Sequence, residues 1–309
     1  MNTPQLKKRS NLIQRTAFTL VEMMVVILII SILAGIATPV IFRAIRITRE
    51  FTIQNEIVQM DAAVEQFNVK YGFYPPAIGP GLEIDTNNSA VALANFRRYL
   101  NRIAPNHDEG GVTGASRLNI WWNNVGVNLN ADSSLVFWLS GLCLSKQYPL
   151  SGSVRAAGSL APYDANRFVD DSDALDTNGN ALMVDRDVFY QFQVDQLVSV
   201  GGFAGIKAYH QANGSGDSLA FVYRDSKSYI SADSSISHAY HLGLDGSGNP
   251  VNFFNPTTFQ IVGPGMDGQI ADLTATPPLT NIQGLTDFTQ DDNITNFAEG
   301  RLDSLDEFE

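Results

Sequence analysis

The chain has 309 residues, which is enough for one large domain or two modest ones, and its apolar content is sufficient to close a core. A formal net charge of −12 argues against nucleic-acid binding, because that role needs a basic face to replace phosphate counterions. The single cysteine, Cys143, cannot form an intramolecular disulfide, and its apolar surroundings predict a buried thiol.

The N-terminal segment predicts a membrane anchor with its amino terminus in the cytoplasm. No acidic residue occurs before position 18, and the apolar run is preceded by four basic residues: Lys7, Lys8, Arg9 and Arg15. Residues 18–42 contain one ionisable group, Glu22, and a helix of this length covers about 37 Å, enough to cross a bilayer. A secretory signal peptide has a shorter apolar region with the small residue after it, whereas Ala17 precedes this one.

Glu22 is a carboxylate inside this apolar run, where a charge costs a few kcal/mol unless it snorkels or finds a partner. The stretch RTAFTLVE, residues 15–22, resembles the processing site of type IV prepilins and pseudopilins, although that family usually has glycine where this chain has Ala17. The resemblance implies that a prepilin peptidase cuts between Ala17 and Phe18 and methylates the new amino terminus on Phe18. It also implies that the Phe18 amine, in the same subunit or in a neighbour, pairs with Glu22. The alternative is a snorkelling carboxylate that marks the start of an ordinary anchor helix.

Beyond the anchor, residues 43–72 predict an amphipathic continuation of the same helix. Apolar residues recur there at spacings of four and three, and polar residues occupy the other faces. Pro39 removes a backbone donor and predicts a kink, so the helix is either continuous to about Tyr71 or divided near Pro39 and Arg43. The apolar stripe consists of Ile53, Ile57, Met60, Val64, Phe67 and Tyr71.

Residues 73–309 predict one globular α+β domain, in which the long N-terminal helix packs on a mostly antiparallel β-sheet. Gly72 with prolines after it predicts the end of the long helix, and further helices are expected at 88–103 and 134–144. Aromatic and β-branched runs bounded by turn residues predict four strands, at 188–194, 219–223, 228–230 and 257–262.

Two other features of this domain carry local predictions. The Trp121-Trp122 pair is expected to fill core rather than to stack on a ligand. Residues 245–249, DGSGN, predict a hairpin turn.

Two later stretches resemble the calcium-bearing end of the major pseudopilin family: residues 259–268, FQIVGPGMDG, and residues 291–297, DDNITNF. In that family a strand leads to a Gly-x-Asp-Gly turn, and a later Asp-Ile-x-Asn-aromatic segment returns. Carboxylate, amide and backbone oxygens are the ligands that a hard cation takes. The alternative is a pair of Asp/Asn turns that need no metal. The resemblance implies four calcium-ligand candidates, in this order: Asp267, Asp292, Asp291 and Asn293.

In this comparison the connection between the two stretches is longer than the family's, and Asn293 stands where a second aspartate is expected. A further acidic stretch, residues 170–180, lacks the leading carboxylate of an EF-hand loop and predicts a solvated loop.

Catalysis has little support in the sequence. His238 and His241 would share one face if helical and could bind a transition metal with His210, but no Glu lies at the spacing of a zinc-protease motif. There is no phosphate-cradling Gly-rich loop and no nucleophile elbow, so we expect no enzymatic activity.

The resemblance implies a structural subunit of a type IV pilus-like or type II secretion pseudopilus filament. Its partners would be prepilin peptidase, membrane lipid, an inner-membrane assembly platform with its ATPase, and other copies of itself or related pseudopilins. One N-terminal helix would hold the chain in the bacterial inner membrane, with the globular domain periplasmic or extracellular. The alternative is a surface adhesin or ligand-binding protein delivered by a pilin-type anchor, which the size of residues 73–309 suggests. The expected parts are a cytoplasmic leader at 1–17, a transmembrane and filament-core helix at 18–42, its continuation at 43–72 and the globular domain at 73–309.

Overall fold

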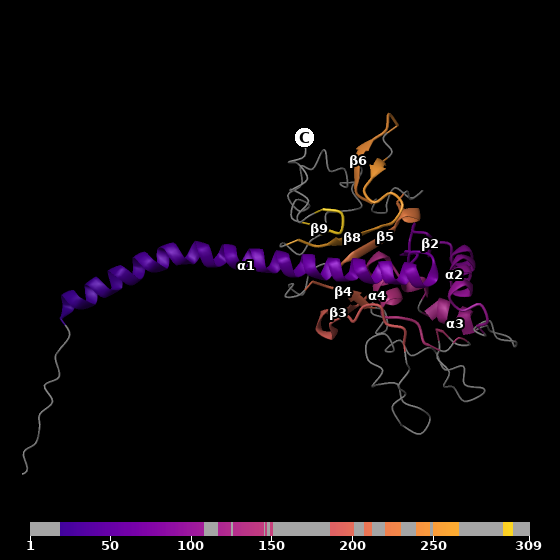
Figure 1. The fold of residues 1–309 in the computed structure, drawn as a ribbon, viewed down its shortest axis with the longest axis horizontal. Coiled ribbons are helices and arrows are strands. Elements are labelled where there is room, and N and C mark those ends of the chain that lie inside the picture. Colours follow the sequence, from indigo (N-terminus) through magenta and orange to yellow (C-terminus); the bar gives the residue numbers. More distant parts are fainter. Residues whose placement is uncertain are drawn as a thin grey trace, which may run out of the picture. The chain divides into compact units, whose positions relative to one another are not determined.

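The computed structural model divides the chain into two compact units, Met1–Thr48 and Arg49–Glu309, and each is described by itself. Figure 1 shows the elements in chain order. The residues that the structure describes are 19–107, 117–124, 126–144, 146, 149–150, 186–200, 207–211, 220–229, 239–247, 250–265 and 293–298.

Helix α1, Leu20–Tyr71, is continuous, so of the two alternatives the structure has the single helix (Figure 1). Pro39 lies inside α1 and removes one backbone donor without ending it. Gly72 follows the helix with a φ of 75°, in the left-handed region, and its N–H donates to the carbonyl of Asn68 at 2.8 Å. The predicted end of the helix at Gly72 is confirmed.

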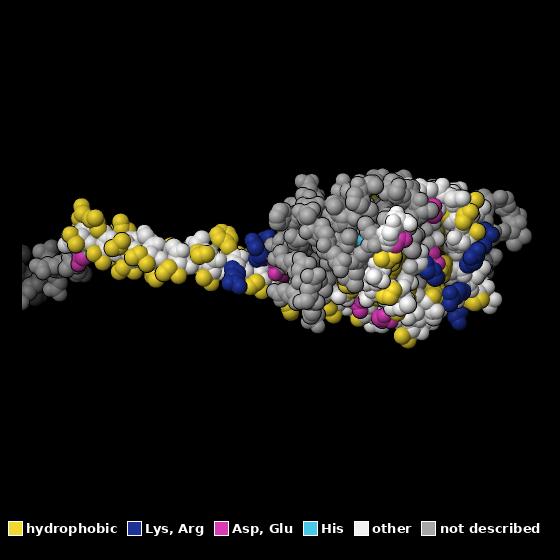
Figure 2. All heavy atoms as spheres, turned by 90° about the horizontal axis from the view of Figure 1, so that it is seen from above, with side chains coloured by type: hydrophobic (Ala, Val, Ile, Leu, Met, Phe, Trp, Pro, Cys, Tyr) yellow, Lys and Arg dark blue, Asp and Glu magenta, His cyan; other side chains and the backbone are white. Residues whose placement is uncertain are grey.

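In the first unit, the α1 side chains are exposed from Leu20 to Thr48. An 18-residue window of α1 has a mean hydropathy of 2.8, and none of that window is buried. Figure 2 shows apolar side chains along this part of the helix. By length and composition, α1 is the one helix of the described ranges that could cross a membrane.

Three shorter helices lie in the second unit: α2, Ser89–Ile103; α3, Arg117–Asn124; and α4, Ala131–Leu139. The prediction for α2 is confirmed, and the side chain of Asn88 caps it by accepting the N–H of Val91. Helix α4 begins earlier and ends earlier than predicted, so residues 140–144 are not helical. Gly141 has a φ of 86°, and a Cβ there would lie 2.3 Å from the carbonyl oxygen of Asp187, so the chain turns at this glycine.

The strands form small sheets, and every pairing except that of β1 with β2 is antiparallel. The central sheet has the order β5-β8-β9, with β5 at Val222–Asp225, β8 at Phe259–Gly263 and β9 at Ile294–Thr295. The two-stranded sheets pair β1, Ile78–Gly79, with β2, Ile84–Asp85; β3, Leu197–Ser199, with β4, Lys207–Tyr209; and β6, His241–Leu244, with β7, Pro250–Phe253.

The α+β prediction is therefore confirmed, with a long helix followed by small antiparallel sheets. Strand β8 confirms the strand expected at 257–262, and β5 overlaps the one expected at 219–223. Residues 245–249 connect the antiparallel strands β6 and β7, as the predicted hairpin requires.

Two predicted strands are wrong. Residues 188–193 form no strand, because the N–H groups of Phe189 and Tyr190 both donate to the carbonyl of Leu139 at the end of α4. Residues 226–228 form the 3₁₀ helix η5, Ser226–Ser228, where a strand was expected from Ser228 onward. Its cap is Asp225, whose side chain accepts the N–H of Lys227 and the hydroxyl of Ser228.

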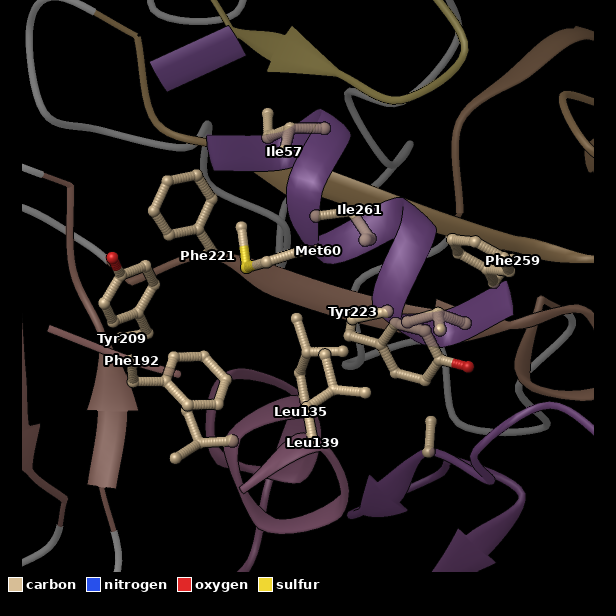
Figure 3. Close-up of a cluster of buried hydrophobic side chains, with 14 of the residues drawn as sticks. Ile57, Met60, Leu135, Leu139, Phe192, Tyr209, Phe221, Tyr223, Phe259 and Ile261 are labelled. Atoms are coloured by element: carbon tan, nitrogen blue, oxygen red, sulfur yellow. The ribbon is translucent and has the colours of Figure 1, made fainter. Parts of the chain in front are cut away.

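The core of the second unit joins the α1 stripe to the central sheet. Ile57 and Met60 of α1 are fully buried (Figure 3). They cluster with Phe221, which precedes β5, with Tyr223 of β5 and with Ile261 of β8. The predicted mutual burial of helix stripe and sheet face is confirmed.

A second cluster is rich in aromatic side chains. Trp122 is fully buried and Trp121 is 2% exposed, and Trp121 stacks on Phe96 of α2 with ring centroids 4.8 Å apart. Both tryptophans fill core, as predicted, and Cys143 is buried as well.

Candidate functional site: the start of helix α1

The first turn of α1 is closed by a reciprocal set of hydrogen bonds between Thr19 and Glu22. The carboxylate oxygen Oε2 of Glu22 accepts the backbone N–H and the hydroxyl of Thr19, each at 2.8 Å. The backbone N–H of Glu22 in turn donates to Oγ1 of Thr19 at 3.2 Å. This is a capping box, in which both side chains satisfy N–H groups that have no partner within the helix. A negative charge at this end is also favoured by the helix dipole.

The capping box holds the carboxylate of Glu22 at Thr19, which is two positions after Ala17 in the sequence. Ala17 and Phe18 lie outside the described residues, so their geometry is not part of the structure. Thr19 directly follows Phe18 in the chain, and its backbone N–H holds the Glu22 carboxylate at 2.8 Å. A new amine on Phe18 would therefore form one residue away from a group that already contacts Glu22.

Thr19 was not among the residues that the sequence analysis singled out. The signal is present in the sequence, because Thr19-Leu20-Val21-Glu22 has the spacing of Thr and Glu that defines a capping box at a helix start. Glu22 stands at the N3 position of this box, which is an ordinary place for a carboxylate at the start of a helix.

Hydroxyl groups inside the apolar part of α1 are satisfied within the helix. The side chain of Ser31 donates to the carbonyl of Ile27, and that of Thr38 donates to the carbonyl of Ala34, both at 2.7 Å. Neither hydroxyl needs water as a partner, so both are compatible with hydrocarbon or with a protein interior. The outer surface of residues 20–42 is then apolar except at its N-terminal end.

The end of the central sheet contains the fourth calcium-ligand candidate. Strands β8 and β9 pair with Gly263 opposite Ile294, so the later stretch does return beside the earlier one. Asn293 precedes β9 and is fully buried, and its Nδ2 donates to the hydroxyl of Tyr240 at 3.1 Å. The other three candidates, Asp267, Asp291 and Asp292, lie outside the described residues.

The chemistry at Asn293 fits a hard cation. Its Oδ1 is buried and accepts no hydrogen bond from any described residue. An amide oxygen of this kind can be a calcium ligand, and the sequence places Asp291 and Asp292 directly before it and Asp267 in the earlier stretch. Within the described ranges by themselves, no group of three or more His, Cys, Asp or Glu side chains is placed to hold a metal ion.

The remaining metal hypotheses gain no support. The acidic stretch 170–180 and His238 lie outside the described residues. His241 lies in strand β6 rather than in a helix, so the interpretation of His238 and His241 as one helical face is wrong. His210 pairs through its backbone with Ala220 in an isolated bridge.

Asn296, directly after β9, contacts α1 inside the second unit. Its Nδ2 donates to Oδ1 of Asp61 on α1 at 2.8 Å, and its Oδ1 accepts the N–H of Ile261 in β8 at 2.9 Å. One amide therefore links helix α1, strand β8 and the segment after β9. Burial raises the pKa of Asp61, although this hydrogen bond acts in the opposite direction.

Two buried carboxyl groups lie elsewhere in the second unit. Burial raises the pKa of Asp132, at the start of α4, to about 6, and its Oδ1 has no hydrogen-bond partner in the described ranges. Burial, together with the nearby Glu83, raises the pKa of Asp225 to about 7. Asp225 also accepts the N–H of Ala77 at 3.1 Å, so it fixes the chain after α1 to η5. The contacts of Asp225 hold parts of the fold together.

Comparison with known proteins bears on the start of α1. A family model described as the prokaryotic N-terminal methylation motif matches residues 14–38, a span that contains Ala17, Phe18 and Glu22. This match supports a type IV pilin-like protein and indicates a substrate of prepilin peptidase. Neither the comparison with curated proteins nor that with solved structures gave a match. With the exposed apolar helix, the motif fits a membrane-anchored chain that assembles with other pilin subunits.

Proposed function

We propose that the chain is a structural subunit of a type II secretion pseudopilus or a related type IV pilus-like filament, and that it has no enzymatic activity. The observation that carries the proposal is the methylation motif at residues 14–38 on a helix whose apolar surface is exposed. An apolar surface of this length needs lipid before assembly and other helices after it.

In this proposal the chain is inserted in the bacterial inner membrane with its amino terminus in the cytoplasm. Prepilin peptidase removes residues 1–17 and methylates Phe18. The removal takes four basic residues away, so the side-chain charge changes from −12 to −16, with 16 basic residues against 32 acidic ones. An assembly platform and its ATPase then extract the subunit into a filament on the periplasmic side.

Glu22 would select the position of each incoming subunit. Its carboxylate caps the helix and carries a charge at the start of an apolar surface. A subunit packed in the wrong register would bury this charge without a cation, which is strongly unfavourable. The Phe18 amine, in the same subunit or its neighbour, is the cation that cleavage supplies.

Calcium would brace the end of the central sheet. The ligands proposed are Asp267, Asp292, Asp291 and the buried amide oxygen of Asn293. A cation there would join the segment after β8 to the one before β9, and it would add ligation energy to the folded state alone.

The experiment compares filament assembly of two variants of the full chain in its native host with that of the wild-type chain in cells with and without the peptidase. Glu22→Ala should abolish filaments, whereas the matched control Met23→Ala, at the next position of the same helix, should assemble normally. Wild-type chain in cells without the peptidase should stay uncut and unassembled. Normal filaments from Glu22→Ala would contradict the proposal. A processed chain that stays monomeric and binds a surface ligand would favour the adhesin alternative.

A further inference from the structure

Helix α2 presents a basic face in an acidic chain. Arg97 and Arg98 are both exposed, and the sequence has no acidic residue from 86 to 107. Figure 2 shows Lys and Arg side chains gathered at the end of the globular unit where Figure 1 places α2. Such a concentration of positive charge attracts an anionic partner.

The third arginine of α2 is already engaged within the fold. Nη2 of Arg102 donates to the carbonyl of Gly72 at 3.2 Å, and its guanidinium lies 4.4 Å from the ring centroid of Phe73. Arg97 and Arg98 differ from Arg102, because neither forms an ion pair with any residue in the described part of the chain. Within the described ranges their charge is therefore unpaired.

Apolar groups on α2 adjoin these two arginines. Val91 is 51% exposed, and Ala94 and Arg98 follow it at spacings of three and four, which places all three on one side of the helix. We call Val91, Ala94, Arg97 and Arg98 the α2 face. It combines an apolar first half with a basic second half, so its complement must be both apolar and acidic.

The chain itself contains such a complement in residues 302–309, LDSLDEFE. Four of its residues are acidic, and Leu302, Leu305 and Phe308 recur every third position between them. The stretch 170–176, DDSDALD, is equally acidic, but its two apolar residues are adjacent and cannot alternate with the charges in this way. Residues 302–309 therefore match the α2 face in both charge and apolar spacing.

We propose that the α2 face binds the acidic segment 302–309 of a second copy of this chain. Arg97 and Arg98 are exposed, so they are open to a segment of another copy. The inference rests on the proposed function, since a filament brings copies of the chain together and each copy carries this face and this segment. Contacts of this kind, repeated from copy to copy, would offset part of the repulsion between subunits of charge −16.

The test is cysteine cross-linking between two differently tagged full-length copies that are expressed together. One copy carries Ala94→Cys and the other carries Ser304→Cys, so that every charged residue of the contact is kept. The natural Cys143 is buried and serves as a silent background. Oxidation should give a heterodimer on a non-reducing gel, and a control copy with Lys207→Cys in place of Ala94→Cys should not.

Charge reversal then shows whether the arginines cause the contact. Adding Arg98→Glu to the first copy should lower the heterodimer yield about tenfold, because the ion pair of Arg98 is lost and a like-charge contact replaces it. Adding Glu307→Arg to the second copy should restore most of the yield. Lys207→Glu, with the same change in net charge elsewhere, should leave the yield unchanged.

Several results would overturn the inference. These are no heterodimer, a yield that Arg98→Glu does not change, a disulfide that forms only when both cysteines are in one copy, or a stronger disulfide from Ser172→Cys than from Ser304→Cys. The last would assign the face to residues 170–176. Electron microscopy of the same cells separates this from the proposed function: filaments without the cross-link contradict only the contact described here, and a missing filament contradicts the proposed function.

Discussion

The backbone N–H of Thr19 lies 2.8 Å from Oε2 of Glu22, and this bond makes the conspicuous carboxylate of the apolar helix one half of its N-terminal capping box. A capping role and an assembly role are compatible, since the carboxylate can accept the Thr19 N–H and still face a cation at Phe18. The capping role and the assembly role predict different results for substitutions at Thr19 and Glu22.

Thr19→Val removes the hydroxyl from the capping box and keeps the charge of Glu22. We expect a loss of about 1 kcal/mol in the stability of the first turn and filament yields close to those of the wild type. Glu22→Gln keeps a capping oxygen and removes the charge, and it should abolish filaments. Both yields are measured by quantitative immunoblotting of sheared filaments. If Thr19→Val fails as completely as Glu22→Gln, capping and not charge is the function of Glu22.

Gly263 of β8 packs closely against Phe221 and against Ile53 of α1 in the core of the second unit. A Cβ there would lie 2.7 Å from Cε1 of Phe221 and 3.2 Å from Cγ2 of Ile53, so Gly263→Ala should destabilise the fold by about 1–3 kcal/mol. Thermal unfolding of the purified full chain in detergent measures the change. Gly246→Ala is the control, since no atom lies within 4 Å of a Cβ at that position. Equal stability of the two variants would contradict the packing.

The two buried carboxyl groups set the pH dependence of unfolding. The pKa of Asp132 is raised from 3.8 to about 6 and that of Asp225 from 3.8 to about 7, so the folded chain binds more protons than the unfolded one between pH 4 and 7. Stability should therefore rise as the pH falls from 8 to 5. Asp132→Asn should raise the free energy of unfolding at pH 8 by about 1–3 kcal/mol and flatten its pH dependence. A midpoint that falls steadily from pH 8 to pH 5 would contradict these shifts.

Calcium binding predicts that the midpoint of thermal unfolding rises with the calcium concentration. Added at about 100 times its dissociation constant, calcium should stabilise the chain by about 2.7 kcal/mol, and a chelator should reverse the effect. Asn293→Ala should reduce the shift, while Ala in place of the exposed Asn87 should leave it intact. Differential scanning calorimetry provides the comparison. If calcium leaves the wild-type midpoint unchanged, the metal proposal fails.

The long helix could be predicted from the sequence because its signals extend over many residues. The apolar run and the stripe from Ile53 to Phe67 repeat the helical period often enough to outweigh Pro39. Short aromatic runs were less informative. Phe189 and Tyr190 have the composition of a strand, but their N–H groups bond to one carbonyl at the end of α4, which is a contact across fifty positions that composition does not encode.

The candidate site shows the same contrast. The cleavage motif and Glu22 are local in sequence and could be read directly, as could the capping partner Thr19. The buried, unpartnered amide oxygen of Asn293 could not, because its burial depends on the packing of Tyr240 and on the pairing of β9 with β8.

The central claim is that this chain is cut before Phe18 and then assembled through the exposed helix. Mass spectrometry of the N-terminal peptide from the membrane fraction tests it most directly. The account predicts a mature chain that begins at Phe18 with a methyl group on its amine. A chain that retains residues 1–17 in wild-type cells, or one that begins elsewhere, would contradict it.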